Sequence, residues 1–205
     1  MNITNKETIE KIIKIEWEMF QKVENMGGRA SCQDDFETFY IMRFSQYGSW
    51  PGKMVECYAK FVEKCRLSGR NLLTEKYARM MEFTHPDYYI KNIAPVLPEV
   101  PEANKVFIDK IVKSMIDWET DFSKKYPKLA GVSRPVTADG DMSGFTSMET
   151  YARGELATYP LTLLELYAAY TDQLDAEGNS LSLINQQIMV NMYGYDTIED
   201  AEASL

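Results

Sequence analysis

The sequence predicts an all-α protein of about eight helices, arranged as two similar four-helix units joined by a proline-rich connector. Three observations support this fold class: apolar residues recur at helical spacing, strand-like runs are scarce, and motifs of the first half return in the second. We therefore expect a first unit over residues 1–84, a connector over 85–101 and a second unit over 102–205, packed on the first as one globular body.

Composition and charge limit the function classes. The chain has 205 residues and a net charge of −9, and its 22 basic residues are scattered rather than clustered. We expect no nucleic-acid partner, because no basic surface would follow a phosphate backbone. The apolar runs are shorter than the roughly 18 residues that cross a membrane, and the first residues lack a signal-peptide core. The sequence therefore predicts a cytoplasmic protein with no membrane partner.

Cysteine and histidine are too few for the common metal sites. The 3 cysteines form no CxxC pair, and the 1 histidine, His85, stands directly before Pro86. A residue before proline often ends a helix, and we assign that role to His85. We expect no disulfide framework, no metal and no other cofactor.

The first helix carries a charged residue, Glu16, in the middle of an apolar stripe. That stripe consists of Ile9, Ile12, Ile13, Phe20 and Val23. A second helix, capped by Asp34 or Asp35, carries Arg43 on its inward face. A buried carboxylate and a buried guanidinium are each costly alone, so we predict that Glu16 and Arg43 meet, directly or through Arg29 or a ligand. A core ion pair that fixes helix register is the favoured interpretation, and a binding site is the alternative.

The loop between these helices, residues 25–33, contains Gly27, Gly28, Arg29 and Cys32. Glycines permit close backbone approach to a ligand, and Arg29 is suited to bind an anion. No P-loop or dinucleotide fingerprint surrounds these residues, so a nucleotide site is not predicted. Cys32 lies just before a helix N-terminus, but the acids that follow it oppose a thiolate, and we expect a half-buried, unreactive thiol.

The second half repeats the pattern of the first. Two further helices, near residues 54–65 and 71–83, complete the first unit, and four prolines between 86 and 101 then form a stiff connector. Residues 165–181 align without a gap on 56–72. Isolated matches extend the similarity: Tyr159 with Tyr47, Trp118 with Trp17, and Arg134 with Arg29. The simplest interpretation is a duplicated four-helix unit.

The second unit supplies the remaining candidate site residues. Its loop over residues 126–146 is rich in glycine and proline, which is typical of a mobile lid. In the next helix Tyr151 and Glu155 face inward, and Arg153 lies beside them. If the two halves face each other, six charged residues converge on one cavity with Trp17, Tyr40 and Tyr151 as walls. These six are Glu16, Arg29, Arg43, Arg134, Arg153 and Glu155.

Several long runs resemble a known family. These are WEMFQKVENMGGRASCQDDFETFYIMRFSQ, GRNLLTEKYARMME, YPKLAGVSRP, ETYARGELATY and YGYDTIEDAE. They are similar to a bacterial family of unknown function, domain-of-unknown-function family 4125, over nearly the whole chain. The resemblance implies a soluble protein and brings no activity, cofactor or catalytic residue with it.

Three functions stay open at this point. The first is binding of a small anionic or zwitterionic ligand between the two halves, by the arginines and aromatic walls named above. The second is an enzyme that uses Glu16 or Glu155 as acid or base, or Cys32 as nucleophile. The third is an oligomerising scaffold or accessory module, with aromatic surfaces around Trp50 and residues 88–89. The sequence does not predict the oligomeric state.

Overall fold

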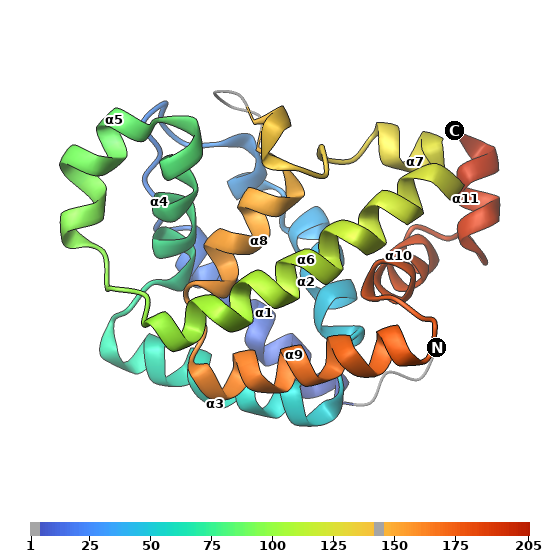
Figure 1. Ribbon diagram of the computed structural model, residues 1–205, viewed down its shortest axis with the longest axis horizontal. Coiled ribbons are helices and arrows are strands. Elements are labelled where there is room, and N and C mark those ends of the chain that lie inside the picture. Colours follow the sequence, from blue (N-terminus) through green and yellow to red (C-terminus); the bar gives the residue numbers. More distant parts are fainter. Residues whose placement is uncertain (1–4, 142–145) are drawn as a thin grey trace.

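The computed structural model describes residues 5–141 and 146–205 and is built from helices alone in this part of the chain. Eight longer α-helices form its body (Figure 1). They are α1 (Lys6–Phe20), α2 (Phe36–Gly48), α3 (Gly52–Ser68), α4 (Leu72–Thr84), α6 (Glu102–Lys125), α8 (Met148–Leu156), α9 (Leu161–Ala176) and α10 (Leu181–Met192). The all-α prediction is confirmed.

Three short helices raise the number of α-helices in the described residues to eleven, so the prediction of about eight was too low. They are α5 (Pro86–Tyr88), α7 (Pro127–Gly131) and α11 (Ile198–Ser204). Two of them begin at a proline, which fits the first turn of a helix although it breaks the interior. Helices of one or two turns are too short to show apolar periodicity, which is why the sequence pattern missed α5 and α7.

The helix boundaries follow from local capping chemistry. The carboxylate of Asp35 accepts a hydrogen bond from the backbone N–H of Thr38 at 3.0 Å and caps α2. Asn71 caps α4 in the same way, and Ser147 caps α8. At the other end of α3, Gly69 has φ +76°, a left-handed conformation that glycine adopts without strain.

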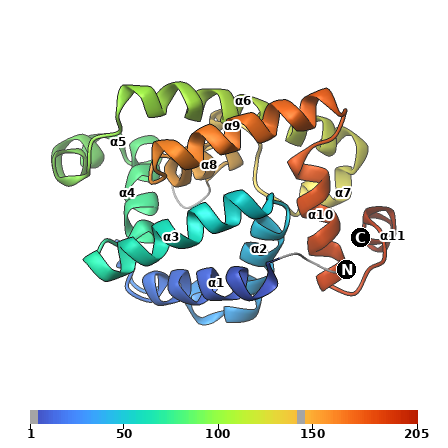
Figure 2. The same ribbon diagram turned by 90° about the horizontal axis from the view of Figure 1, so that it is seen from below.

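The core joins helices from both halves of the chain. α1 packs against α2, α3 and α4, while α6 packs against α8, α9 and α10. Between these groups, α4 packs against α8, α10 against α2, and α3 against α9. Figure 2 shows α6 and α9 along one side of the molecule and α1 along the opposite side. Side chains that reach the space between these layers are therefore buried by both halves.

The predicted connector is partly helical. After α5 it continues through a π-helical turn, η2 (Tyr89–Ile93), and a 3-10 turn, η3 (Ala94–Val96), and η2 packs along α4 (Figure 1). At the other end of the molecule, α11 packs on α7 and α10 and closes a small second core. No helix in the described part of the chain is long and apolar enough to cross a membrane.

Candidate functional site

Glu16 and Arg43 form an ion pair in the middle of the molecule. Glu16 on α1 is 0% exposed and Arg43 on α2 is 5% exposed. The guanidinium donates from Nε to Glu16 Oε2 at 2.8 Å and from Nη2 to Glu16 Oε1 at 2.5 Å. This two-point pairing confirms the prediction that the two residues meet, and they meet directly.

A second carboxylate and a second cation extend this pair. Arg43 Nη1 donates to both carboxylate oxygens of Glu155 on α8, at 3.1 and 3.0 Å. Lys76 on α4, itself 1% exposed, donates from Nζ to Glu155 Oε2. We call Glu16, Arg43, Lys76 and Glu155 the buried charge network. It joins four helices and balances two negative charges with two positive ones.

Polar neighbours complete the hydrogen bonding of both carboxylates. The hydroxyls of Tyr47 and Tyr58 donate to Glu16 Oε1 at 2.7 and 2.6 Å. The hydroxyl of Tyr159 and the side-chain amide of Gln46 each donate to Glu155 Oε1 at 2.7 Å. A buried ion pair offsets its desolvation cost only when its remaining lone pairs are satisfied in this way.

The network holds Glu155 in its ionised form. Burial raises the pKa of Glu155, but the charges of Arg43 and Lys76 outweigh burial and hold this pKa well below its ordinary value of 4.5. For Tyr58, burial and then the Glu16 carboxylate raise the pKa well above 10. Glu155 therefore stays ionised at neutral pH and is poorly suited to exchange protons with a substrate there.

Tyr151 connects the network to the surface. Its half-buried ring has Lys76 Nζ 3.3 Å from the centroid, and Arg134 Cζ lies 4.9 Å from the same centroid. Both contacts have cation–π geometry. Burial raises the pKa of the Tyr151 hydroxyl, but Lys76 and then Arg43 reverse this effect and bring the pKa below its ordinary value.

The other residues of the first-half prediction lie away from the network. Arg29 is exposed and donates to Asp34 Oδ1 at 2.9 and 2.8 Å and to the backbone oxygen of Gln33, so it ties the loop to itself. Cys32 is exposed rather than half-buried, because the 3-10 turn Ser31–Asp34 carries it on the surface. Trp17 is half-buried and packs against three phenylalanine rings, Phe20, Phe36 and Phe39.

The predicted convergence of six charged residues on one cavity is therefore wrong in part. Three of them meet in the network, while Arg29, Arg134 and Arg153 do not reach it. Arg153 points outward from α8 and pairs with Asp109 at 2.6 Å and Glu149 at 3.0 Å. Arg134 donates to the backbone oxygen of Thr146 at 2.9 Å. Of the predicted lid, residues 142–145 lie outside the described part of the chain.

Trp50 also differs from the sequence interpretation, which placed it on an aromatic surface. It is 6% exposed and makes edge-on contacts with four tyrosine rings, those of Tyr47, Tyr58, Tyr159 and Tyr167. Tyr88 is exposed, as a surface residue should be. An indole among phenol rings is a core feature, so Trp50 is not available to a partner.

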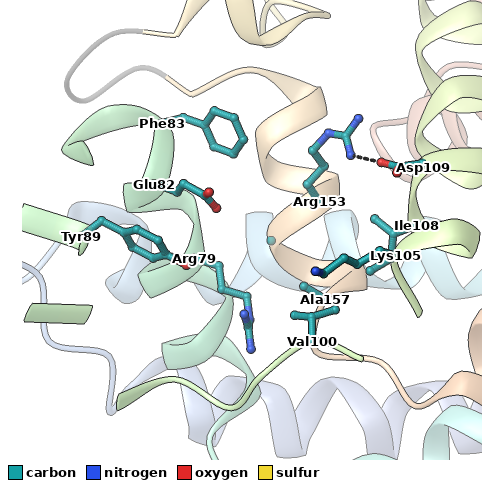
Figure 3. A pocket seen from close by; sticks show the side chains of 11 residues that line it. Arg79, Glu82, Phe83, Tyr89, Val100, Lys105, Ile108, Asp109, Arg153 and Ala157 are labelled. Carbon is teal, nitrogen blue, oxygen red and sulfur yellow. Dashed lines mark hydrogen bonds and ion pairs between the residues drawn. The ribbon is translucent and has the colours of Figure 1, made fainter. Parts of the chain in front are cut away.

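A pocket of about 250 Å³ lies beside the network, between α4, the connector, α6 and α8 (Figure 3). Its charged lining residues are Arg79, Glu82, Lys105, Asp109 and Arg153. The rest of its wall consists of Phe83, Tyr89, Val100, Ile108, Gly154 and Ala157. Residues of both predicted units and of the connector thus enclose one space.

The charges of the pocket are incompletely paired. Arg79 donates from Nη2 to the backbone oxygen of Pro98 at 2.6 Å, but its buried Nε has no hydrogen-bond partner among the described residues. In the same part of the chain neither Arg79 nor Glu82 forms an ion pair. Among residues 5–141 and 146–205, Lys105 pairs only with Glu102, at 2.8 Å, in a largely exposed bridge.

Sequence reasoning missed both Lys76 and the pocket. Lys76 follows Leu73 by three positions and precedes Met80 by four, so it lies inside an apolar helical stripe, as Glu16 does. That signal could have found it. Arg79 and Glu82 give no such signal, because α8, which closes the pocket beside them, is distant in sequence from α4.

No group of three or more potential metal ligands occurs among residues 5–141 and 146–205. In comparisons with known proteins, residues 6–203 match the model of a family described as protein of unknown function, DUF4125. No curated protein and no solved structure matches the chain. Since the match covers nearly the whole sequence, the chain belongs to the DUF4125 family.

Proposed function

We propose that the protein binds a small anionic molecule in the pocket between α4, α6 and α8. The observation that carries this proposal is Arg79, whose buried Nε has no partner in the described residues. Leaving a buried donor unsatisfied costs about 1 to 3 kcal/mol, and an oxygen of a bound anion would remove this cost. Lys105 lines the same pocket and adds positive charge, in a chain whose net charge is −9.

The buried charge network would support this site rather than form it. Lys76 on α4 and Glu155 on α8 pair directly, and α4 and α8 are also two walls of the pocket. Gly154 brings these helices together, because a Cβ there would lie 3.0 Å from the backbone oxygen of Lys76. Walls held by such contacts lose little conformational freedom when a ligand binds, which favours affinity.

Thermal unfolding in the presence of small anions tests the proposal. Inorganic phosphate, succinate and benzoate serve as probes, and a ligand that binds the folded state raises Tm as its concentration rises. We expect at least one probe to raise the Tm of the wild type and of Arg66→Met, but not of Arg79→Met. Arg66 is a matched control, because it forms an exposed ion pair with Glu63 on α3. The proposal fails if no probe shifts the wild type, or if Arg79→Met keeps the shift.

We also propose that the chain consists of two similar four-helix units. Its support, beyond the sequence alignment, is the reciprocal packing described above: α1 contacts the three long helices that follow it, and so does α6. The fourth helix of each set packs against the second helix of the other. Superposing residues 6–84 on 102–192 in an experimental structure tests this idea. It is wrong if α6, α8, α9 and α10 fit α1 to α4 no better than unrelated helical bundles do.

A further inference from the structure

The lining of the pocket contains unpaired charge of both signs. Arg153 and Asp109 neutralise each other at 2.6 Å, which leaves Arg79, Lys105 and Glu82. The bridge of Lys105 to Glu102 has side chains 54% and 82% exposed, and bridges of that kind contribute little energy. Lys105 can therefore turn to a ligand at low cost.

Arg79 and Glu82 are the important pair. They are three residues apart on α4, a spacing at which opposite charges on a helix commonly pair, yet they form no ion pair with each other. In Figure 3 the Arg79 guanidinium points toward the Val100 end of the pocket, and the Glu82 carboxylate lies nearer its Phe83 end. The pocket thus presents a cationic and an anionic group from neighbouring turns of one helix.

Tyr89 lies beside both of these charged residues (Figure 3). Burial raises the pKa of its hydroxyl, the negative charge of Glu82 raises it further, and the positive charge of Arg79 opposes the change. The phenol therefore stays protonated and can donate or accept a hydrogen bond beside both groups. Apolar side chains, Val100 and Ile108, form the adjoining wall.

From these features we infer that the ligand of the proposed function is a zwitterion of amino-acid size, whose carboxylate is the anionic group that Arg79 binds. Its carboxylate would meet Arg79 and Lys105, its ammonium would meet Glu82, and its apolar side chain would lie against Val100 and Ile108. An α-amino acid carries its ammonium and its carboxylate on the same carbon. It can therefore pair with two oppositely charged side chains on neighbouring turns of one helix. The volume of about 250 Å³ is below the roughly 300 to 1,000 Å³ of pockets for larger ligands. This inference rests on the proposed function and narrows its ligand class.

Calorimetry with matched ligand sets tests the inference. L-leucine and L-phenylalanine are compared with analogues that lack the amine, 4-methylpentanoate and 3-phenylpropanoate, and with those that lack the carboxylate, isopentylamine and phenethylamine. We expect the wild type to bind an amino acid at least about tenfold more tightly than either analogue, since each analogue lacks one charge-assisted hydrogen bond.

Variants separate this inference from the proposed function. Glu82→Gln should weaken amino-acid binding about tenfold or more and leave the amine-free acid unaffected, while Arg79→Met should weaken both. Glu24→Gln is the matched control, since Glu24 is an exposed glutamate far from the pocket in the sequence.

If the amine-free acids bind as tightly as the amino acids and Glu82→Gln changes nothing, the zwitterion inference is wrong and the anion proposal stands. If the amines bind as tightly as the amino acids, the zwitterion inference is also wrong. If neither acids nor amino acids bind in an Arg79-dependent way, both are wrong.

Discussion

Two charged regions of the molecule, the buried charge network and the pocket, differ in how their charges are compensated. In the network, Arg43 and Lys76 neutralise two carboxylates whose oxygens also accept hydrogen bonds from tyrosines and a glutamine. In the pocket, Arg79 and Glu82 have no ion partner among the described residues. Both regions draw on α4, which places Lys76 and Arg79 one turn apart. Charges with protein partners hold helices together in this molecule, whereas charges without a protein partner line the pocket in which we propose that a ligand binds.

The largest effect should come from breaking the network at its centre. Arg43→Met leaves two buried carboxylates with one cation, and such a loss typically costs about 3 to 5 kcal/mol. Urea denaturation should show this as a lower midpoint. Arg66→Met is the matched control, because its exposed pair with Glu63 should contribute no more than about 1 kcal/mol. Equal losses of unfolding free energy in Arg43→Met and Arg66→Met would show that Arg43 contributes no more to stability than an exposed ion pair does.

The pH dependence of stability should follow Glu155. Because its folded-state pKa lies below the ordinary value of 4.5, the ionised form stabilises the fold above that pH. This contribution decreases as the pH falls below 4.5 toward the folded-state pKa. In Glu155→Gln, the free energy of unfolding should therefore change less steeply with pH in this acid range, although the variant is less stable at pH 7. If the free energy of unfolding changed equally steeply with pH in the wild type and in Glu155→Gln, the prediction that Glu155 has a lowered pKa would be wrong.

The sequence allows much of the network to be predicted, and the reason is local. Glu16 and Arg43 interrupt apolar stripes at helical spacing, and Glu155 occupies the matching position in the second half. The spacing of apolar residues indicates which side of a helix faces inward, so a charged residue on that side is predicted to be buried. It does not report which helices become neighbours, and the identity of the fourth member, Lys76, was missed although its stripe carries the same signal.

The pocket could not be predicted in this way. It exists because the connector folds back along α4 and places Tyr89 and Val100 opposite α6 and α8. That arrangement also depends on the packing of α4 against α8, which are far apart in sequence. Local sequence patterns do not predict such contacts. For the same reason Arg134 and Arg153 were assigned to one cavity, although Arg134 binds the backbone oxygen of Thr146 and Arg153 pairs with Asp109 and Glu149.

A smaller effect is expected at the contact that joins the two regions. In Gly154→Ala the new Cβ would lie 2.9 Å from Met80 Cγ and 3.0 Å from the backbone oxygen of Lys76. The methionine can move, but the backbone oxygen cannot, and such overpacking costs about 1 to 3 kcal/mol. The better helix propensity of alanine offsets about 0.5 to 1 kcal/mol of this loss.

Gly131→Ala provides the control for this change. Gly131 ends α7, and a Cβ added there would have no neighbouring atom of the described residues within 4 Å, so the substitution should leave Tm unchanged or slightly raised. A Gly154→Ala protein as stable as Gly131→Ala would mean that α4 and α8 can separate without cost. The support that the network gives to the pocket would then be much weaker than the contacts suggest.

The smallest effect on stability should come from Arg79→Met, at the centre of the pocket. This change removes one hydrogen bond, to the backbone oxygen of Pro98, but no ion pair among the described residues, and it relieves the unsatisfied Nε. The free energy of unfolding should therefore stay within about 1 kcal/mol of the wild type in urea denaturation without ligand. A loss as large as that of Arg43→Met would place Arg79 among the residues that hold the fold, and the contrast between the two charged regions would disappear. A stable Arg79→Met protein that no longer responds to anions would instead separate folding from binding. Arg43 has carboxylate partners within the chain, whereas the partner of Arg79 would be the ligand.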